Sequence, residues 1–437
     1  MSVGLWVEEF AAPQMSAMRS VDRKGGLYLR YFPTGLDEHM AKYLNSAAAE
    51  SVTDATAAIA RIGQVLRVRP MPILYATLLR SESISSSWVE GLRETPRNIM
   101  VAQLGDHDPG LTGYQFERLG TARAILGNLK SVRTGIRSLR QEWTHGGIDD
   151  LHRIITPDVA SGYRKIDVQI GGTSKVSADY VAPPAELVPS LMANLLDYAN
   201  RSSDSPVTKA AIIHAQFETI HPYEDGNGRT GRVLVHGYLA RAGLVDEGVM
   251  PLSVVLRRAP EQYVKHLMAF RHGDLAARSA AVSEFVGYFA QALTDSVVET
   301  EKVIAQAEAV EQDWADRTRR FRADSKIHEA VRVLVEQPVV TARFLAATLN
   351  TTAVTARTTI DNLLSVGVLE ESGGRFKRSQ VYQASALLNM MDQLVPGLQP
   401  TALPKPIWQS HRATPDTISS ESSAVRPRQD SNLRPTD

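Results

Sequence analysis

The sequence of 437 residues contains no cysteine. Disulfide bonds, thiolate metal ligands and cysteine nucleophiles are therefore excluded, and the composition suits a reducing compartment. The chain also lacks a charge excess, because 48 lysines and arginines balance 48 aspartates and glutamates. Any contact with a nucleic acid or a membrane must then come from a local patch of charge.

Long apolar runs are missing as well. No segment approaches the roughly 20 apolar residues that cross a bilayer, and residues 1–15 have no basic stretch followed by an apolar core. We therefore expect a cytoplasmic protein with no membrane partner. With 437 residues, 43% of them hydrophobic, the chain is long enough for two or three globular domains.

Apolar residues recur at helical spacing along most of the chain, which predicts a mainly α-helical protein. Residues 162–180 differ, because Val168 and Ile170 alternate with polar neighbours before Gly171 and Gly172. That pattern predicts a short β-hairpin, which we call the flap. The predicted helices span residues 47–68, 71–84, 114–139, 142–155, 185–200, 205–220, 232–242 and 285–314.

A separate pattern begins near residue 326. A helix at 327–336, two further helices and two short strands around Val368 and Val381 follow the order of a winged helix-turn-helix domain. Residues after 396 are rich in proline, serine and threonine without apolar periodicity, so we expect disorder there. The predicted division is an N-terminal helical region (1–110), a core (111–295), a connecting helix (296–325), a winged helix (326–395) and a tail (396–437).

The residues best suited to chemistry lie in one loop, 221–232. Its glycines let the backbone approach a ligand closely, and it opens into a helix whose free N–H groups favour a phosphate. Arg229 and Arg232 are three positions apart, so both can reach the same phosphates. Asp225 is a carboxylate of the kind that holds Mg²⁺ together with phosphate oxygens, and His221 can accept a proton near neutral pH. The loop therefore predicts phosphate-ester chemistry with ATP as the donor.

Each of these features is common when it occurs alone, since a histidine before proline usually ends a helix and a GxG is usually a turn. In this order and spacing, however, the segment HPYEDGNGRTGR resembles the signature of the Fic family, HxFx(D/E)GNGRxxR. Tyr223 stands where phenylalanine is usual, and it can anchor the loop if its hydroxyl finds a partner. The resemblance extends more loosely over residues 142–290 and includes the flap.

The resemblance implies an all-helical Fic core that acts as a protein adenylyltransferase. AMP would pass from ATP, with Mg²⁺, to a serine, threonine or tyrosine hydroxyl of a target protein, including the enzyme itself. His221 would be the general base and Asp225 would hold Mg²⁺. The phosphates would be bound by Gly226, Asn227, Gly228, Arg229 for the β-phosphate and Arg232 for the γ-phosphate.

The flap resembles the target-docking hairpin of the same family. An extended target segment would add as a strand along Val168, Gln169, Ile170 and Gly171. A plain surface hairpin is an equally good interpretation of this pattern.

An inhibitory motif of the form (S/T)xxxE(G/N) is fitted by Ser86 and Glu90, which lie one helical turn apart on one face. Its position before the loop resembles the class of Fic proteins with an N-terminal brake. The resemblance implies that Glu90 pairs with Arg232 and so denies that arginine to the γ-phosphate.

Three alternatives to an adenylyltransferase stay open. The winged helix binds either DNA or a protein, a homodimer included, so the chain could be a nucleotide-sensing transcriptional regulator. The same loop with a nearby glutamate could also position water and remove AMP from a modified protein. An unrelated metal hydrolase is disfavoured, because one histidine and one or two acids are too few ligands.

Overall fold

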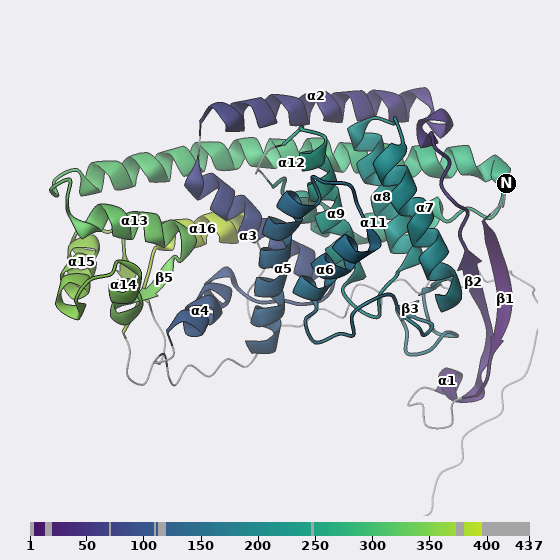
Figure 1. The fold of residues 1–437 in the computed structure, drawn as a ribbon, viewed down its shortest axis with the longest axis horizontal. Coiled ribbons are helices and arrows are strands. Elements are labelled where there is room, and N and C mark those ends of the chain that lie inside the picture. Colours follow the sequence, from purple (N-terminus) through teal and green to yellow (C-terminus); the bar gives the residue numbers. More distant parts are fainter. Residues whose placement is uncertain are drawn as a thin grey trace, which may run out of the picture.

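The computed structural model describes residues 4–13, 20–69, 71–108, 111, 119–245, 249–372 and 380–395. The predicted mainly helical class is confirmed, and the predicted tail lies outside the described residues (Figure 1). The strands are β1 (Leu5–Ala11), β2 (Gly26–Phe32), β3 (Gln169–Ile170), β4 (Tyr180–Val181), β5 (Val339–Thr341), β6 (Glu370–Glu371) and β7 (Val381–Gln383). The helices are α1 (Ser20–Lys24), α2 (Ser46–Val68), α3 (Pro72–Val89), α4 (Pro96–His107), α5 (Leu119–Ser138), α6 (His145–Ile155), α7 (Val188–Arg201), α8 (Pro206–Ile220), α9 (Asn227–Arg241), α10 (Leu252–Arg258), α11 (Pro260–Phe270), α12 (Leu275–Thr318), α13 (Lys326–Glu336), α14 (Ala342–Thr348), α15 (Ala353–Ser365) and α16 (Ser385–Leu394), with 3₁₀ turns at Met40–Tyr43 and Ala185–Leu187.

The centre of the fold is the helix pair α8 and α9. Every residue of α8 after Pro206 is buried, and so is every residue of α9 before Arg241. Ser205 begins α8 by accepting the N–H of Thr208 at 3.3 Å, with Pro206 at the first helical position as the sequence predicts. Helices α3, α5, α7 and α12 pack around this pair. The loop 221–232 therefore connects two helices that are buried at the centre of the fold.

The longest element is α12, which runs beside α2 along one side of the molecule (Figure 1). Its 44 residues extend the predicted helix 285–314 at both ends, and Asp274 caps its start by accepting the N–H of Ala277 at 2.6 Å. The helix crosses the predicted boundary between residues 295 and 296 without a break. The core and the C-terminal module (residues 326–395) are thus joined by one continuous helix.

The N-terminal region differs from its helical prediction, because β1 and β2 form an antiparallel hairpin. β2 continues in parallel to β4, and β4 pairs with β3, so the sheet order is β1-β2-β4-β3. A short strand is stabilised mainly by pairing with its neighbours. Here Arg30 of β2 pairs with Val181 of β4, which is far away in the sequence. The predicted flap is present as β3 and β4, and β3 forms the edge of this sheet.

The C-terminal module contains a helix, two further helices and a three-stranded antiparallel sheet in the order β5-β7-β6. The strand predicted around Val368 is present as β6, which begins two residues later at Glu370. The winged-helix assignment stays a prediction, and residues 373–379 lie outside the described part of the chain. Arg80 of α3 donates to the carbonyls of Val335 and Glu336 at 2.9 and 2.8 Å, so the module is seated on α3.

Glu82 joins α3 to the core. Its buried carboxylate contacts His236 Nε2 of α9 at 2.9 Å and accepts the N–H and hydroxyl of Ser253 at 2.7 and 2.6 Å. Removal of the carboxylate would leave its buried polar partners without a hydrogen bond. Glu82→Ala is therefore expected to lower the free energy of unfolding by about 3 kcal/mol in urea titrations. The exposed Glu50 of α2 provides the control, since Glu50→Ala should change it by less than about 0.5 kcal/mol. Equal effects of the two substitutions would contradict this account.

Candidate active site

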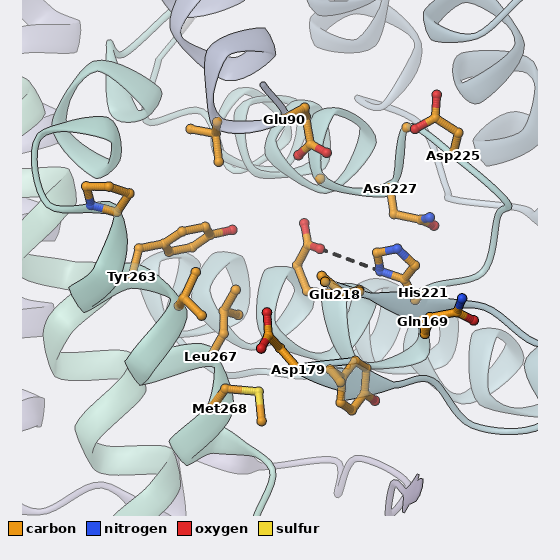
Figure 2. Close-up of a pocket in the computed structure, with 18 of the residues that line it drawn as sticks. Glu90, Gln169, Asp179, Glu218, His221, Asp225, Asn227, Tyr263, Leu267 and Met268 are labelled. Carbon is orange, nitrogen blue, oxygen red and sulfur yellow. Dashed lines mark ion pairs between the residues drawn. The ribbon is translucent and has the colours of Figure 1, made fainter. Parts of the chain in front are cut away.

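A cavity of about 370 Å³ opens beside the loop 221–232, between the flap, α11 and the end of α3 (Figure 2). This is the size of a small-molecule site. Three predicted site residues are absent from its described lining: Ser86, Val168 and Arg229. The predicted residues that do line it are Glu90, Gln169, Ile170, Gly171, His221, Asp225, Gly226, Asn227, Gly228 and Arg232.

The loop is held in shape by its own side chains. His221 ends α8 in the left-handed region, with φ of 50°. The side chain of Asn227 accepts the N–H of Tyr223 and donates to its carbonyl, both at 2.9 Å. These two bonds fix the Asn227 amide against the loop backbone, and the residue also presents its backbone N–H. That N–H and the N–H of Gly228 lie in the first turn of α9, where helical N–H groups have no partner within the helix.

The aromatic position of the loop is filled by Tyr223, which is 1% exposed. Its hydroxyl donates to Asp149 Oδ1 at 2.6 Å, and its ring stacks on His152 with 3.6 Å between the ring centroids. The predicted need of the hydroxyl for a partner is thereby confirmed. Both partners lie on α6, and His152 Nε2 also contacts the carbonyl of Asp225 at 2.8 Å. Helix α6 therefore supports the loop through these contacts.

His221 faces the cavity with a neutral imidazole. Burial and the charges of Arg271 and Arg164 together lower its pKa to about 3. Arg164 also fixes the position of the residue, since its Nε donates to the carbonyl of His221 at 2.8 Å and its Nη2 to that of Pro183 at 2.6 Å. A neutral imidazole has a free lone pair at physiological pH, which a general base requires.

The predicted contact between Glu90 and Arg232 is present. Arg232, 1% exposed, donates from Nη2 to Glu90 Oε1 at 2.9 Å. The same guanidinium donates to the hydroxyl and the carbonyl of Ser86 at 2.9 and 2.8 Å. Glu90 also lies directly above Gly228, where a Cβ atom would overlap its carboxylate. Glu90 therefore binds the guanidinium of Arg232 and also fills the space over the first turn of α9.

Arg229 lies outside the described lining of the cavity. It is buried, donates from Nη1 to the carbonyl of Ile155 at 3.3 Å, and lies 3.4 Å from Asp225 Oδ2. Its guanidinium thus contacts both the end of α6 and the Asp225 carboxylate. Its predicted role at the β-phosphate stays a prediction.

The cavity offers an anion site and the exposed carboxylates of Asp179, Glu224 and Asp225. Asp225, with 65% of its side chain exposed, stands at the mouth beside the free N–H groups of α9. Among the described residues, no three His, Cys, Asp or Glu side chains gather as a metal cluster. A single carboxylate with substrate phosphate oxygens still fits Mg²⁺, which keeps several waters and takes one or two protein carboxylates.

The opposite wall of the cavity is apolar and was not found from the sequence. It comes from α11, whose amphipathic pattern is that of an ordinary surface helix. Tyr263 is fixed there by a 2.7 Å contact between its hydroxyl and His214 Nε2. The side chains that form this wall are Pro260, Tyr263, Val264, Leu267 and Met268.

Sequence analysis also missed Glu218, which lies three residues before His221. Burial raises the pKa of its carboxyl to about 7, the charge of Arg232 opposes that shift, and the charge of Glu90 adds to it. No pattern in the sequence marks this residue, because the groups that perturb it come from distant segments.

Residues 143–239 match the model of the Fic/DOC family. The chain contains a Fic/DOC domain. Across the described residues, no helix combines the length and hydropathy needed to cross a membrane. The Fic/DOC domain begins before α6 and ends within α9, so it includes the flap, the loop 221–232 and Arg232.

Three similar relatives are named protein adenylyltransferases. The "Probable protein adenylyltransferase" of Aquifex aeolicus (strain VF5) is 34% identical over 119 residues, 27% of this chain and 33% of that protein. Protein adenylyltransferase Fic of Nematostella vectensis is 25% identical over 210 residues, 46% of this chain and 43% of that protein. The fic-1 protein of Caenorhabditis elegans is 31% identical over 147 residues. This chain therefore spans less than half the length of the relatives it matches.

One solved structure, a Fic family protein from Desulfovibrio desulfuricans G20, aligns with 21% identity and a TM-score of 0.47. The alignment covers 81% of this chain and 98% of that one.

Proposed function

We propose that the chain is a protein adenylyltransferase that transfers AMP from ATP to a hydroxyl group of a protein. One observation carries the proposal: His221, the free N–H groups at the start of α9, and Arg232 all line the same cavity. A base beside a phosphate-binding helix start supports transfer to a phosphorus atom. The relatives named above as protein adenylyltransferases support the same reaction.

His221 takes the proton of the acceptor hydroxyl, and the hydroxyl oxygen forms a bond to the α-phosphorus. The bond from that phosphorus to the bridging oxygen breaks, and pyrophosphate leaves. The N–H groups of Asn227 and Gly228 bind phosphate oxygens at the start of α9, while Arg232 binds the terminal phosphate. Asp225 would hold Mg²⁺, which neutralises part of the phosphate charge. The apolar wall of α11 accommodates the nucleoside.

The target protein is proposed to add as a strand along β3. This strand lies at the edge of the four-stranded sheet, and Gln169, Ile170 and Gly171 line the cavity. An edge strand offers unpaired N–H and C=O groups to an extended segment. A segment bound there would carry its hydroxyl toward His221.

Glu90 is proposed to hold the enzyme inactive. While it pairs with Arg232, the terminal phosphate of ATP lacks its arginine and meets a carboxylate above Gly228. ATP can then bind only in a displaced position, in which the α-phosphorus is misplaced for attack.

Removal of AMP from a modified protein is the second candidate, because the Glu90 carboxylate lines the same cavity as His221 and could orient a water molecule. Replacement of Glu90 separates the two candidates. Transfer increases if Glu90 is a brake, and hydrolysis is lost if Glu90 positions the water.

The reaction class is tested with ATP that carries a radioactive phosphorus at either the α or the γ position. The proteins are incubated with Mg²⁺ and a cell lysate and separated by gel electrophoresis. AMP transfer predicts protein-bound label from the α position and none from the γ position. Label from the γ position alone would mean phosphorylation and would overturn the proposal.

A further inference from the structure

Glu218 lies in the last turn of α8 with its carboxylate enclosed in the cavity wall. The residue is 6% exposed, and its Oε1 has no hydrogen-bond partner. His221 Nδ1 is also buried without a hydrogen bond, and it lies 3.9 Å from Glu218 Oε2 (Figure 2). Buried polar groups are almost always paired. A buried carboxylate and a buried ring nitrogen this close together, each side chain with an unsatisfied atom, are therefore a candidate functional pair.

The neighbouring donors do not provide Glu218 with a structural partner. Arg232 is engaged by Ser86 and Glu90, and Arg271 donates to the backbone carbonyl of Glu218 at 3.3 Å. The Tyr263 hydroxyl contacts a histidine nitrogen instead. Burial of a carboxylate without a hydrogen-bond partner lowers the stability of the fold, so a role in packing alone does not explain Glu218.

We propose that Glu218 is the positioning residue of His221: its carboxylate accepts the Nδ1–H of the imidazole, which leaves Nε2 free to take the proton of the acceptor hydroxyl. This inference rests on the proposed function. At 3.9 Å the two groups are beyond hydrogen-bond distance, and closure by about 1 Å would give a hydrogen bond. Catalytic hydrogen bonds are often long without substrate and shorten when it binds.

The charge of Glu218 matters once the reaction begins. The proton taken from the hydroxyl makes His221 an imidazolium, while the hydroxyl oxygen bonds to the α-phosphorus and pyrophosphate leaves. Arg271 and Arg164 both disfavour that positive ring. The Glu218 carboxylate stabilises it, because opposite charges in a buried site attract strongly. Each turnover ends when the proton leaves the ring for solvent.

The pair makes activity depend on pH near neutrality. Burial raises the pKa of Glu218 to about 7. Below that pH the carboxyl is protonated and carries no charge to stabilise the imidazolium, whereas above it the carboxylate does. Activity should therefore rise with pH through about 7, although His221 itself is neutral far below that value. The charged and titratable groups that face this pair are Arg232, Glu90, Tyr263, Arg271, Arg164 and Asp225.

The test compares Glu218→Gln with the parent protein, both carrying Glu90→Gly so that the brake is absent. Without the charge of Glu90, the rise in kcat should lie somewhat below pH 7, because that charge adds to the pKa shift. Glu218→Gln should lower kcat at pH 8 by roughly 10- to 100-fold, as for loss of a hydrogen bond to a charged group, and leave KM for ATP within about twofold. It should also abolish the rise. The exposed Glu261 of α11 gives the control, Glu261→Gln, which should keep both.

A second measurement does not depend on activity. The ring resonance of His221, assigned by its absence in His221→Ala, should show an inflection near pH 7 in wild type as Glu218 titrates, and none in Glu218→Gln. An unchanged inflection in Glu218→Gln, or none in wild type, overturns the inference even if AMP is transferred. If no variant transfers AMP while the inflection behaves as expected, the pair exists and the proposed function fails instead.

Discussion

Replacement of His221 by alanine in the Glu90→Gly protein is expected to lower the rate of AMP transfer by about 10²- to 10⁴-fold, the usual contribution of a general base. His221 is the only histidine among the described residues that line the cavity. Its imidazole is neutral because burial and two neighbouring arginines lower its pKa to about 3, so it is ready to accept a proton. Label transfer from ATP gives the rate.

Binding of ATP should survive this substitution, because the phosphates are bound by the start of α9 and by Arg232 rather than by the imidazole. Titration calorimetry should give a dissociation constant within about threefold of the parent, a difference of less than about 1 kcal/mol. The exposed His39 serves as the control, since His39→Ala should leave the rate unchanged. A His221→Ala protein that still transfers AMP at the parent rate would exclude His221 as the base.

Replacement of Glu90 by glycine should increase AMP transfer by about 10- to 100-fold. The contact with Arg232 is a charge-assisted hydrogen bond at 2.9 Å, and such bonds contribute roughly 1.5–3 kcal/mol. Its loss frees the guanidinium for the terminal phosphate, and it empties the space above Gly228. KM for ATP should fall together with the rise in kcat, because the freed arginine acts in both the ground state and the transition state.

The control for this variant is Glu38→Gly, at an exposed residue outside the described cavity lining, which should leave the rate unchanged. Glu90→Gln keeps the size of the side chain but removes its charge, so it should give an intermediate rate. A Glu90→Gly protein that transfers no more AMP than wild type would exclude the brake, and a loss of hydrolysis in that variant would favour AMP removal.

The chemistry of the loop could be predicted because it is local. His221, Asp225 and Arg232 are close in sequence, and one turn between two helices is enough to bring them together. Glu90 could be predicted for a similar reason, since its relation to Ser86 is a single helical turn. Only the contact with Arg232 required the tertiary structure.

Other parts depend on partners that are distant in the chain. The hairpin of β1 and β2 is stabilised by pairing with β4. The perturbed carboxyl of Glu218 arises from burial and from charges on other elements. The orientation of Arg229 is set by the carbonyl of Ile155, which helical spacing does not reveal. Local periodicity determines which residues share a face of a helix or strand. These three features depend instead on which distant elements pack against that face.

One measurement tests the central claim most directly. Wild type, Glu90→Gly and the double variant Glu90→Gly/His221→Ala are incubated side by side with Mg²⁺, a lysate and ATP labelled at the α-phosphorus, and the proteins are separated on a gel. The account predicts strong protein-bound label with Glu90→Gly, weaker label with wild type and none above background with the double variant. Equal label in all three lanes, or none in any lane from proteins that bind ATP, would contradict it.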